Sequence, residues 1–197
     1  LPKVNRKPVE NSSVPIINGL CNLFHPCQLL ADMQTITELK GKDLSKLTIA
    51  WVGDGNNMCN SYINASKLLN FKLKISTPNG YEPDKYTLDK FGNNVEVCEL
   101  PGSAVEGADV VTTDVWTSMG DEHENEERKK IFKGYQVNMN LMSKAKNDSI
   151  FLHCLPAHRG EEIDHDIIDS SHSVVWQQAH NRLYSSMALI NFLLTCE

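Results

Sequence analysis

The chain has 197 residues and a net charge of −6, with 41% hydrophobic and 22% charged residues. This composition is typical of a globular protein with a buried core. The acidic balance argues against nonspecific binding to nucleic acid or to an anionic membrane surface. No apolar stretch reaches the ~18 to 20 residues of a membrane span. Six dispersed cysteines without a C-x-x-C pair favour a reducing, cytoplasmic location and argue against a metal site.

The first 41 residues precede any regular alternation of strands and helices. Residues 1–13 are polar, contain two prolines and have no periodicity, which predicts a poorly ordered tail. Residues 14–17 are predicted to form a short strand. Apolar residues spaced by three and four predict a helix over 24–39, with Pro26 in its first turn and Gly41 at its end.

From residue 42 onward, short apolar runs alternate with amphipathic segments. This alternation predicts an α/β fold, in which a Rossmann-like, mostly parallel sheet is covered by helices on both faces. A last helix is predicted over 178–194. The predicted strands are 47–52, 71–76, 95–98, 109–113, 149–152 and 173–176, and the helices between them are 57–69, 84–91, 103–106, 122–132, 138–145 and 164–168.

A glycine-rich turn, Gly53-Asp-Gly-Asn-Asn-Met58, separates the first predicted strand from its helix. It has two of the three glycines of the dinucleotide-binding motif G-x-G-x-x-G. Met58 holds the third position, where glycine permits close packing of helix and strand, so a nucleotide site is disfavoured. The amides of Asn56 and Asn57 suit a substrate with amino-acid-like groups. The alternative is a tight turn whose asparagines tolerate left-handed geometry.

Polar and reactive residues follow the other strand ends. Asp114 follows the fourth predicted strand, and His153 and Cys154 follow the fifth. Taken singly, Asp114 could merely cap a turn, and a free cysteine is most often a small buried hydrophobe. Ligands of parallel sheets bind beyond the carboxyl ends of the strands. We therefore predict that Asn57, Asp114 and Cys154 line one site.

Two further groups lie on the flanking helices. Arg182, near the start of the last helix, offers a permanent cation for a phosphate or a carboxylate. The stretch His25-Pro26-Cys27-Gln28 puts an imidazole and an amide at a helix N-terminus, which is a favourable location for an anion. As local chemistry, each of these signals is only suggestive.

Together these stretches resemble the ornithine carbamoyltransferase family. The resemblance runs from about residue 14 to residue 194, with the motifs in the family's order and spacing. Two of the motifs indicate ornithine, rather than aspartate, as the acceptor of the carbamoyl group. They are Asp-x-x-x-Ser-Met-Gly and His-Cys-Leu-Pro. The motifs are Phe24-His-Pro-Cys-Gln28 with Leu30-Ala-Asp32, Gly53-Asp-Gly-Asn-Asn57, Asp114-Val-Trp-Thr-Ser-Met-Gly120, His153-Cys-Leu-Pro156 and Asn181-Arg182.

The resemblance implies transfer of a carbamoyl group from carbamoyl phosphate to the δ-amine of L-ornithine, giving L-citrulline and phosphate without a cofactor. It implies that His25 polarises the carbamoyl oxygen, that Arg182 lines the phosphate side, and that Asp114 and Cys154 orient the δ-nitrogen. Cys154 would be a positioning group and not a nucleophile. The implied carbamoyl-phosphate ligands are His25, Pro26, Cys27, Gln28, Cys154, Leu155 and Arg182, and the implied ornithine ligands are Asn57, Asp114, Ser118 and Met119.

The sequence departs from the family in its first part. Family members begin with a carbamoyl-phosphate domain that carries a Ser-x-Arg-Thr-Arg phosphate loop, which this sequence does not contain. We expect residues 14–41 to be a remnant of that domain with a bridging helix, 42–177 to be the ornithine-binding domain and 178–197 to be a second bridging helix. Residues 1–12 fit the family poorly.

Two expectations about behaviour follow from this departure. The chain alone should have little activity. The family's homotrimer forms largely through the other domain, so we expect this chain to pack its terminal helices on each other or on a second copy. The apolar residues expected to lose burial are Leu29, Leu30, Met33 and Ile36 on the first helix, and Leu189, Ile190, Leu193 and Leu194 on the last.

Two other function classes stay open. One is a noncatalytic module that binds ornithine or another amino acid. The other, less favoured, is a nucleotide-dependent Rossmann enzyme. Against the latter stand Met58 and the pair Ser76 and Thr77, which occupy the end of the second strand where an acidic residue would bind a ribose.

Overall fold

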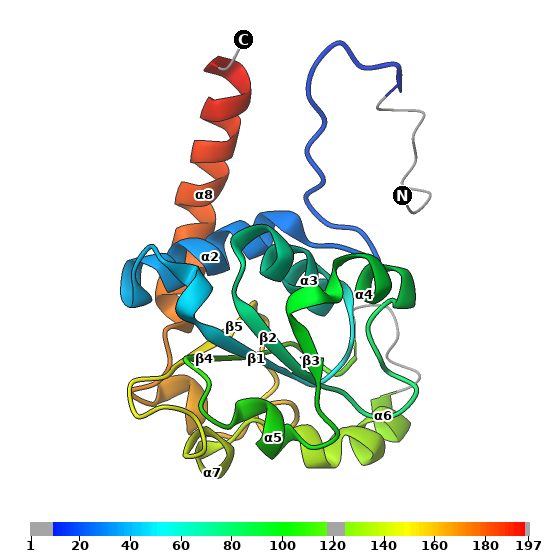
Figure 1. Ribbon diagram of the computed structural model, residues 1–197, viewed down its shortest axis with the longest axis vertical. Helices are drawn as coiled ribbons and strands as arrows, with labels where there is room; N and C mark the ends of the chain where they lie inside the picture. The colour runs from blue at the N-terminus through cyan, green and yellow to red at the C-terminus, as the bar shows by residue number, and fades with distance from the viewer. Residues whose placement is uncertain (1–9, 118–124, 196–197) are drawn as a thin grey trace.

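The computed structural model describes residues 10–117 and 125–195. Within them, five parallel strands form one sheet in the order β3-β2-β1-β4-β5 (Figure 1). The chain moves outward from β1 to β3 and then returns to the other side of β1, so the strand order reverses between β1 and β4. The predicted Rossmann-like α/β fold is confirmed. The strands are β1 (Thr48–Val52), β2 (Lys72–Ser76), β3 (Val95–Val97), β4 (Val110–Thr113) and β5 (Ile150–His153).

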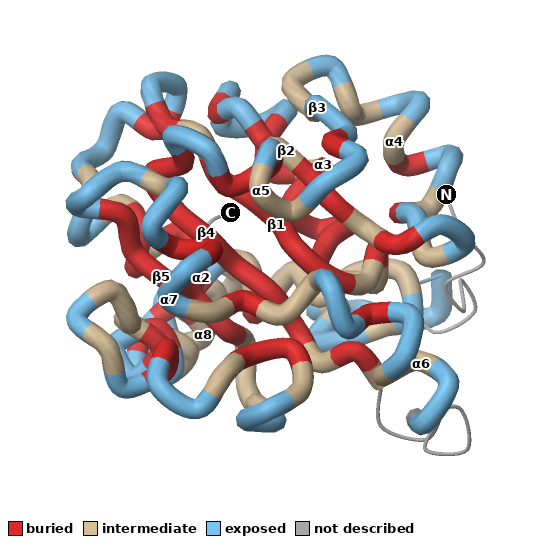
Figure 2. Tube along the Cα trace, turned by 90° about the horizontal axis from the view of Figure 1, so that it is seen from below, coloured by how far each residue is buried: buried red, intermediate tan, exposed pale blue. Residues whose placement is uncertain are grey.

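Helices cover both faces of this sheet (Figure 1). Alternate residues of β1 point to opposite faces. Ile49 and Trp51 belong to one hydrophobic core, and Ala50 and Val52 belong to the other. Figure 2 shows the buried strands at the centre of the molecule. On one face lie α2 (Pro26–Lys40), α3 (Asn57–Leu69) and α4 (Lys85–Phe91), and on the other α5 (Pro101–Val105), α6 (Asn125–Phe132) and α7 (Met139–Met142).

Local sequence signals set the helix boundaries that matter for the site. Pro26 occupies the first turn of α2, and Gly41, with φ of +93°, ends that helix. Asn56 caps α3, because its side-chain oxygen accepts hydrogen bonds from the backbone N–H groups of Met58 and Cys59. These helices therefore begin within one or two residues of the predicted positions. None of the described helices is long and apolar enough to cross a membrane.

Two predicted strands are not strands. Residues 14–17 are irregular and largely exposed, and no described strand pairs with them. Residues 173–176 contribute one isolated bridge, from Ser173 to Phe151, and then enter the helix α8 (Val175–Thr195). The apolar pair Val174 and Val175 packs on the sheet at the start of this helix. Such a short apolar run cannot be assigned to strand or helix by periodicity alone.

The first and last described helices, α2 and α8, pack against each other, as expected. Only part of the expected loss of burial occurs. Met33 and Ile36 are buried in the core cluster, because neighbouring elements cover them, whereas Leu30, Ile190 and Leu194 are exposed. The second half of α8 extends beyond the body of the molecule (Figure 1).

Candidate active site

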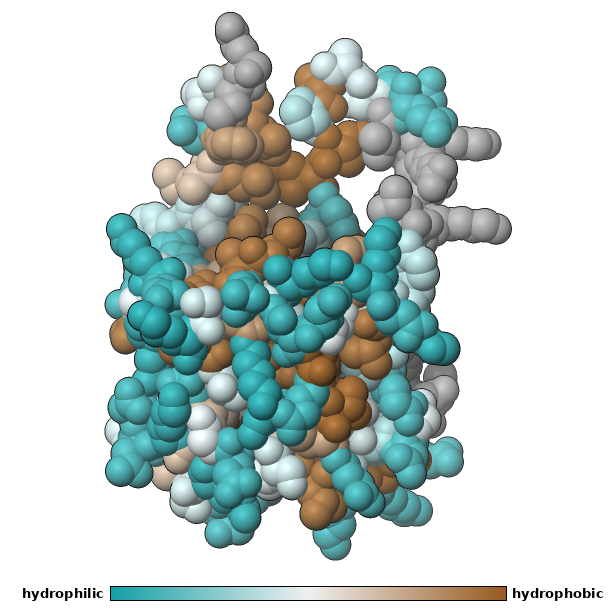
Figure 3. Space-filling view, in the orientation of Figure 1, coloured by the Kyte–Doolittle hydropathy of each residue, from teal (hydrophilic) through white to brown (hydrophobic). Residues whose placement is uncertain are grey.

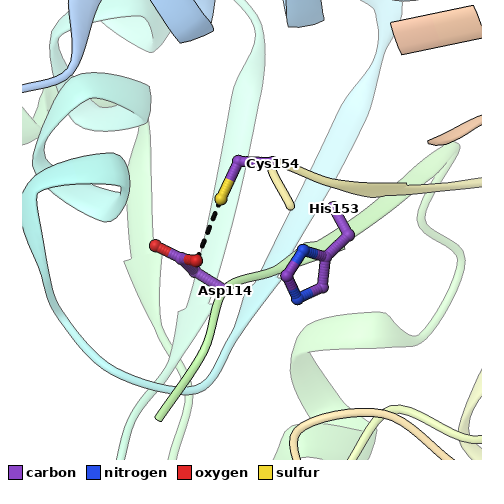
Figure 4. A group of neighbouring side chains, drawn as sticks. All are labelled: Asp114, His153 and Cys154. Carbon is purple, nitrogen blue, oxygen red and sulfur yellow. Dashed lines mark hydrogen bonds between the residues drawn. The ribbon is translucent and has the colours of Figure 1, made fainter. Parts of the chain in front are cut away.

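The carboxyl ends of β4 and β5 bring Asp114 and Cys154 together (Figure 4). The Cys154 thiol donates a hydrogen bond of 2.9 Å to Oδ1 of Asp114, and the Val115 N–H donates to the same oxygen at 2.8 Å. The Asn56 amide donates to Oδ2 at 2.7 Å. Three donors from the ends of β1, β4 and β5 thus fix this buried carboxylate. The predicted proximity of Asp114 and Cys154 is observed, but the asparagine in contact is Asn56 and not Asn57.

The Cys154 thiol is held in its protonated form. Burial raises its pKa well above the ordinary value, and the negative charge of Asp114 raises it further. A protonated thiol is a hydrogen-bond donor and a poor nucleophile, since the thiolate is the reactive form. The geometry therefore favours the positioning role predicted for Cys154.

His153 supports the loop that follows β5. It is fully buried, and its Nδ1 accepts a hydrogen bond from the Leu155 N–H at 2.9 Å. Its Nε2 lies 3.1 Å from a carboxylate oxygen of Glu162. The Leu155 contact assigns the ring proton to Nε2. The contact also holds the backbone of Leu155, whose φ is +57°, beside the site.

His25 and Arg182 approach the same region from the flanking helices. Burial lowers the pKa of His25, and the positive charge of Arg182 lowers it further, while Asp114 opposes the shift. Nδ1 of His25 is buried and has no hydrogen-bond partner among the described residues. Arg182 donates to the carbonyl oxygen of Cys27 at 2.8 Å. A neutral imidazole and a fixed guanidinium thus lie at the N-terminus of α2.

The remaining predicted ligands on α2 are also in this neighbourhood. Pro26 is the first residue of the helix, and the buried Gln28 lies one turn before Asp32. The Cys27 thiol contacts the carbonyl oxygen of Asn18 at 3.5 Å, so its backbone carbonyl, and not its thiol, faces Arg182.

The paired asparagines after β1 have different contacts. Asn56, whose amide suits either a substrate or a tight turn, reaches Asp114. Asn57 instead donates to the carbonyl oxygen of Cys21 at 3.0 Å, which ties α3 to the segment before α2. Ornithine binding by Asn57 stays a prediction. Ser118 and Met119 lie outside the described residues, as do residues 1–9 of the predicted tail.

The glycine-rich turn after β1 packs closely against the segment that precedes α4. A Cβ on Gly55 would lie 2.3 Å from backbone atoms of Glu82 and Pro83, and the Gly55 N–H donates to the Tyr81 carbonyl at 2.9 Å. Met58 is buried in the core. The N–H groups that begin α3 already bond to Asn56. A pyrophosphate would have to replace these contacts, which further disfavours a nucleotide-binding site at this turn.

An ion pair that the sequence pattern does not indicate lies beside the segment that follows β4. Arg128 on α6 contacts the carboxylate of Asp54 and the carbonyl oxygen of Trp116. Its guanidinium lies over the rings of Tyr81 and Phe132, 4.6 and 5.1 Å from their centroids. Burial raises the pKa of Asp54 to about 6, and Arg128 acts in the opposite direction. Arg128 thus joins the ends of β1 and β4.

Among the described residues, two groups of side chains place metal-ligand atoms within 4.8 Å of one another: Asp114 with His153 and Cys154, and His158 with Glu161 and Glu162. In the first group, the thiol proton and both imidazole nitrogens are engaged in hydrogen bonds. In the second, the Glu162 carboxylate accepts from the His158 N–H at 2.6 Å. These bonds tie His153 and Glu162 to the loop after β5.

Two family models match most of the chain. The family model described as "Aspartate/ornithine carbamoyltransferase, Asp/Orn binding domain" matches residues 45–193. The chain belongs to the aspartate/ornithine carbamoyltransferase family. The family's carbamoyl-P binding domain model matches residues 3–38. The similarity thus begins earlier than residue 14, and the expectation that residues 1–12 fit the family poorly is wrong from residue 3 onward.

Individual carbamoyltransferases resemble this chain over nearly its whole length. An ornithine carbamoyltransferase of Methylococcus capsulatus is 54% identical over 186 residues, which are 94% of this chain and 62% of the relative. One from Hydrogenovibrio crunogenus is 50% identical over 98% of the chain and 63% of its own length. The chain therefore spans about three-fifths of these relatives.

Solved structures of carbamoyltransferases share the fold. Ornithine carbamoyltransferase from Burkholderia thailandensis has a TM-score of 0.87 and 46% identity, with 96% of this chain and 61% of that chain covered. Ornithine transcarbamoylase from Giardia lamblia has a TM-score of 0.90 and 30% identity, with 98% and 67% covered.

Proposed function

We propose that this carbamoyltransferase-family chain takes part in carbamoyl transfer from carbamoyl phosphate to the δ-amine of L-ornithine, which gives L-citrulline and phosphate. The observation that carries the proposal is the fixed pair of Asp114 and Cys154 at the carboxyl ends of β4 and β5. The charges of both Arg182 and Asp114 act on the pKa of His25, which supports the proposal because the two residues belong to the two sides of the proposed site.

The carbamoyl group would be held at the N-terminus of α2. His25, kept neutral by burial, donates to the carbamoyl oxygen as negative charge develops there. Donors aimed at such charge are commonly worth ~3 to 4 kcal/mol of transition-state stabilisation. Arg182 neutralises the phosphate. The other proposed ligands are Pro26, Cys27, Gln28, Cys154 and Leu155.

The amine would be held at the ends of β4 and β5. The Asp114 carboxylate accepts hydrogen bonds from the δ-amine, and Cys154 fixes the carboxylate. Asn57, Ser118 and Met119 complete the proposed ornithine ligands. The amine attacks only in its neutral form, because only that form has a free electron pair.

The rate of citrulline formation is expected to rise with pH through the alkaline range. An amine of this kind has a reference pKa of ~10.4, so most ornithine arrives protonated at neutral pH. His25 does not reverse this trend, because its lowered pKa leaves it neutral across the same range. Initial rates at saturating carbamoyl phosphate check the prediction. A rate that stays flat above neutrality would contradict it.

We further propose that residues 14–41 contribute to the carbamoyl-phosphate side, 42–177 form the ornithine-binding domain, and 178–197 form a helix that joins the two sides. Turnover by these 197 residues alone is expected to be low, because the family's Ser-x-Arg-Thr-Arg loop is not among them. Positioning of substrates can supply ~7 to 11 kcal/mol of a reaction barrier. Adding the carbamoyl-P binding domain of a relative should increase citrulline formation.

The chain is also proposed to self-associate through its terminal helices, in place of the homotrimer expected for the family. Apolar side chains gather between α8 and the segment before α2 (Figure 3). Exposed apolar surface of this kind commonly marks a contact site. The lining residues include Ile16, Ile17, Leu30, Leu189 and Leu193.

Self-association is expected to weaken when exposed apolar residues of α8 become charged. Ile190→Glu combined with Leu194→Glu should shift the chain toward monomer, as measured by light scattering over a wide range of concentrations. Leu100→Glu, at an exposed apolar position before α5, is the matched control. An unmodified chain that stays monomeric at all concentrations would overturn the proposal.

Calorimetry with L-ornithine, carbamoyl phosphate and NAD tests the proposed function directly. Binding of the first two is expected. Binding of NAD alone would contradict the proposal in favour of a nucleotide-dependent enzyme. Ornithine binding without citrulline formation, even after the carbamoyl-P binding domain is added, would favour a noncatalytic amino-acid-binding module.

A further inference from the structure

Asp32 is a fully buried carboxylate that connects α2, α3 and α8. Its Oδ1 accepts hydrogen bonds from the Gln28 amide at 2.9 Å and from the Gln178 amide at 2.7 Å. Its Oδ2 accepts from the Tyr62 hydroxyl at 2.8 Å. Arg182 interacts with it electrostatically. One side chain of α2 thus joins α3 and α8 at the point where the proposed substrate ligands meet.

Hydrogen-bond acceptance by Oδ1 of Asp32 determines how the two glutamines are oriented. Burial raises its pKa to about 6, against the effect of its hydrogen bonds and of Arg182, so it is ionised at neutral pH. An ionised carboxylate only accepts hydrogen bonds. The NH₂ groups of Gln28 and Gln178 must therefore face it, which turns both amide oxygens away.

The Gln178 oxygen has a defined use. It accepts a hydrogen bond from the His153 backbone N–H at 3.0 Å. His153 directly precedes Cys154, so a continuous chain of hydrogen bonds runs from Asp32 through Gln178 to the end of β5. Because the Gln28 NH₂ group faces the same carboxylate, the Gln28 side chain can offer its oxygen to a ligand.

We propose that Asp32 is a positioning residue that orients the Gln28 oxygen toward the carbamoyl NH₂ group and fixes the end of β5 that carries Cys154. The proposal rests on the proposed function. The carbamoyl group has an NH₂ donor and an oxygen acceptor at similar distances from its carbon. An acceptor at Gln28 and a donor at His25 distinguish these two ends, so the group is bound in one orientation.

Asparagine at position 32 provides a conservative test of this role. Its side-chain oxygen can accept from both glutamines, and its NH₂ can donate to the Tyr62 hydroxyl, which is also an acceptor. Asp32→Asn therefore keeps the geometry and removes the charge. Asp32→Ala removes every contact, and Asp32→Ser takes its place if the alanine variant does not fold.

Thr35→Val is the matched control for loosening of the α2–α8 contact. The Thr35 hydroxyl is buried about one turn further along α2 and accepts a hydrogen bond from the Asn181 amide at 2.9 Å. Valine keeps its shape and removes this bond, together with the bond of 2.8 Å that the hydroxyl donates to the Ala31 carbonyl oxygen. The hydrogen bonds of the Thr35 hydroxyl go to Ala31 and Asn181 and not to Gln28, so the control loosens the α2–α8 contact without removing a bond to Gln28.

The experiment measures carbamoyl phosphate affinity by calorimetry and the side-chain amide signals of Gln28 and Gln178 by ¹⁵N NMR. We expect Asp32→Ala to weaken binding about tenfold or more, since it removes hydrogen bonds to a charged group. Asp32→Asn and Thr35→Val should stay within about threefold of the unmodified chain, because neither changes the Gln28 orientation. The glutamine signals should lose their dispersion only in Asp32→Ala.

Each alternative outcome is decisive. Unchanged affinity in Asp32→Ala, or equal losses in Asp32→Ala and Thr35→Val, would overturn the positioning role. Loss of affinity in Asp32→Asn with intact glutamine signals would assign the effect to charge and would also overturn it. If the unmodified chain does not bind carbamoyl phosphate, the proposed function fails. The glutamine signals then decide whether Asp32 orients the two amides.

Discussion

Asp114→Asn is expected to reduce the affinity for L-ornithine about 100-fold, as measured by calorimetry in the presence of carbamoyl phosphate. The loss corresponds to about 3 kcal/mol, within the range for truncating one partner of a buried, hydrogen-bonded charge pair. Asp114 accepts from Cys154, Val115 and Asn56. An asparagine would turn its NH₂ group toward some of these donors and would remove the negative charge proposed to bind the amine.

Asp109→Asn separates this effect from a loss of stability. Asp109 is a buried aspartate at the opposite end of the β4 segment, where it accepts from the Thr48 N–H at 2.9 Å and pairs with Lys146 at 2.7 Å. Its substitution should lower stability and leave ornithine affinity unchanged. Equal losses of ornithine affinity in both variants, or an Asp114→Asn variant that binds normally, would contradict the assignment of Asp114.

Arg128→Met is expected to lower the free energy of unfolding by about 3 to 5 kcal/mol at pH 8, as measured by urea denaturation. Removal of one partner of a buried ion pair leaves an uncompensated charge in the interior. The charge left here is the Asp54 carboxylate, which Arg128 contacts. The double variant Asp54→Asn with Arg128→Met should recover much of the loss, because it removes both charges.

The loss in Arg128→Met is expected to shrink as pH falls. The folded-state pKa of Asp54 is about 6, above its ordinary value, and loss of Arg128 raises it further. Between about pH 6 and that higher pKa, the folded variant binds protons that the unmodified folded chain does not bind, so the loss shrinks as pH decreases through this window. Lys85→Met breaks an exposed pair with Asp89 and should cost at most about 0.5 kcal/mol. Equal losses in the two variants would show that the largely buried Arg128–Asp54 pair has no special role.

The fold could be predicted because local signals and global topology agree. Pro26 and Gly41 mark the ends of α2, and the glycine turn before Asn57 separates β1 from α3. The two wrongly predicted strands fall on segments whose hydrophobic periodicity is weak. The run 173–176 is apolar because the first turn of α8 packs on the sheet, and 14–17 is apolar although no described strand pairs with it.

The sequence predicts only those residues of the candidate site that directly follow a strand. Asp114 and Cys154 follow from the rule that ligands bind at the carboxyl edge. The contact of Asn56, rather than Asn57, with Asp114 depends on the direction of a cap, which spacing does not reveal. Asp32 and Gln178 meet across 146 residues of sequence, and no local pattern encodes that contact. A charged residue on the apolar face of α2 was the available signal.

The docking of α8 on α2 has a consequence for the order of folding. Segments this far apart close a long loop, and the associated loss of chain entropy slows such contacts relative to local ones. The sheet, with Asp114 and Cys154 at its edge, is therefore expected to form before Gln178 and Arg182 arrive. During synthesis, a nascent chain would have a folded Rossmann-like sheet, but the proposed carbamoyl-phosphate ligands on α2 and α8 would not yet be in place. Ligand competence should appear only in the last stage of folding, when the final helix closes over the first.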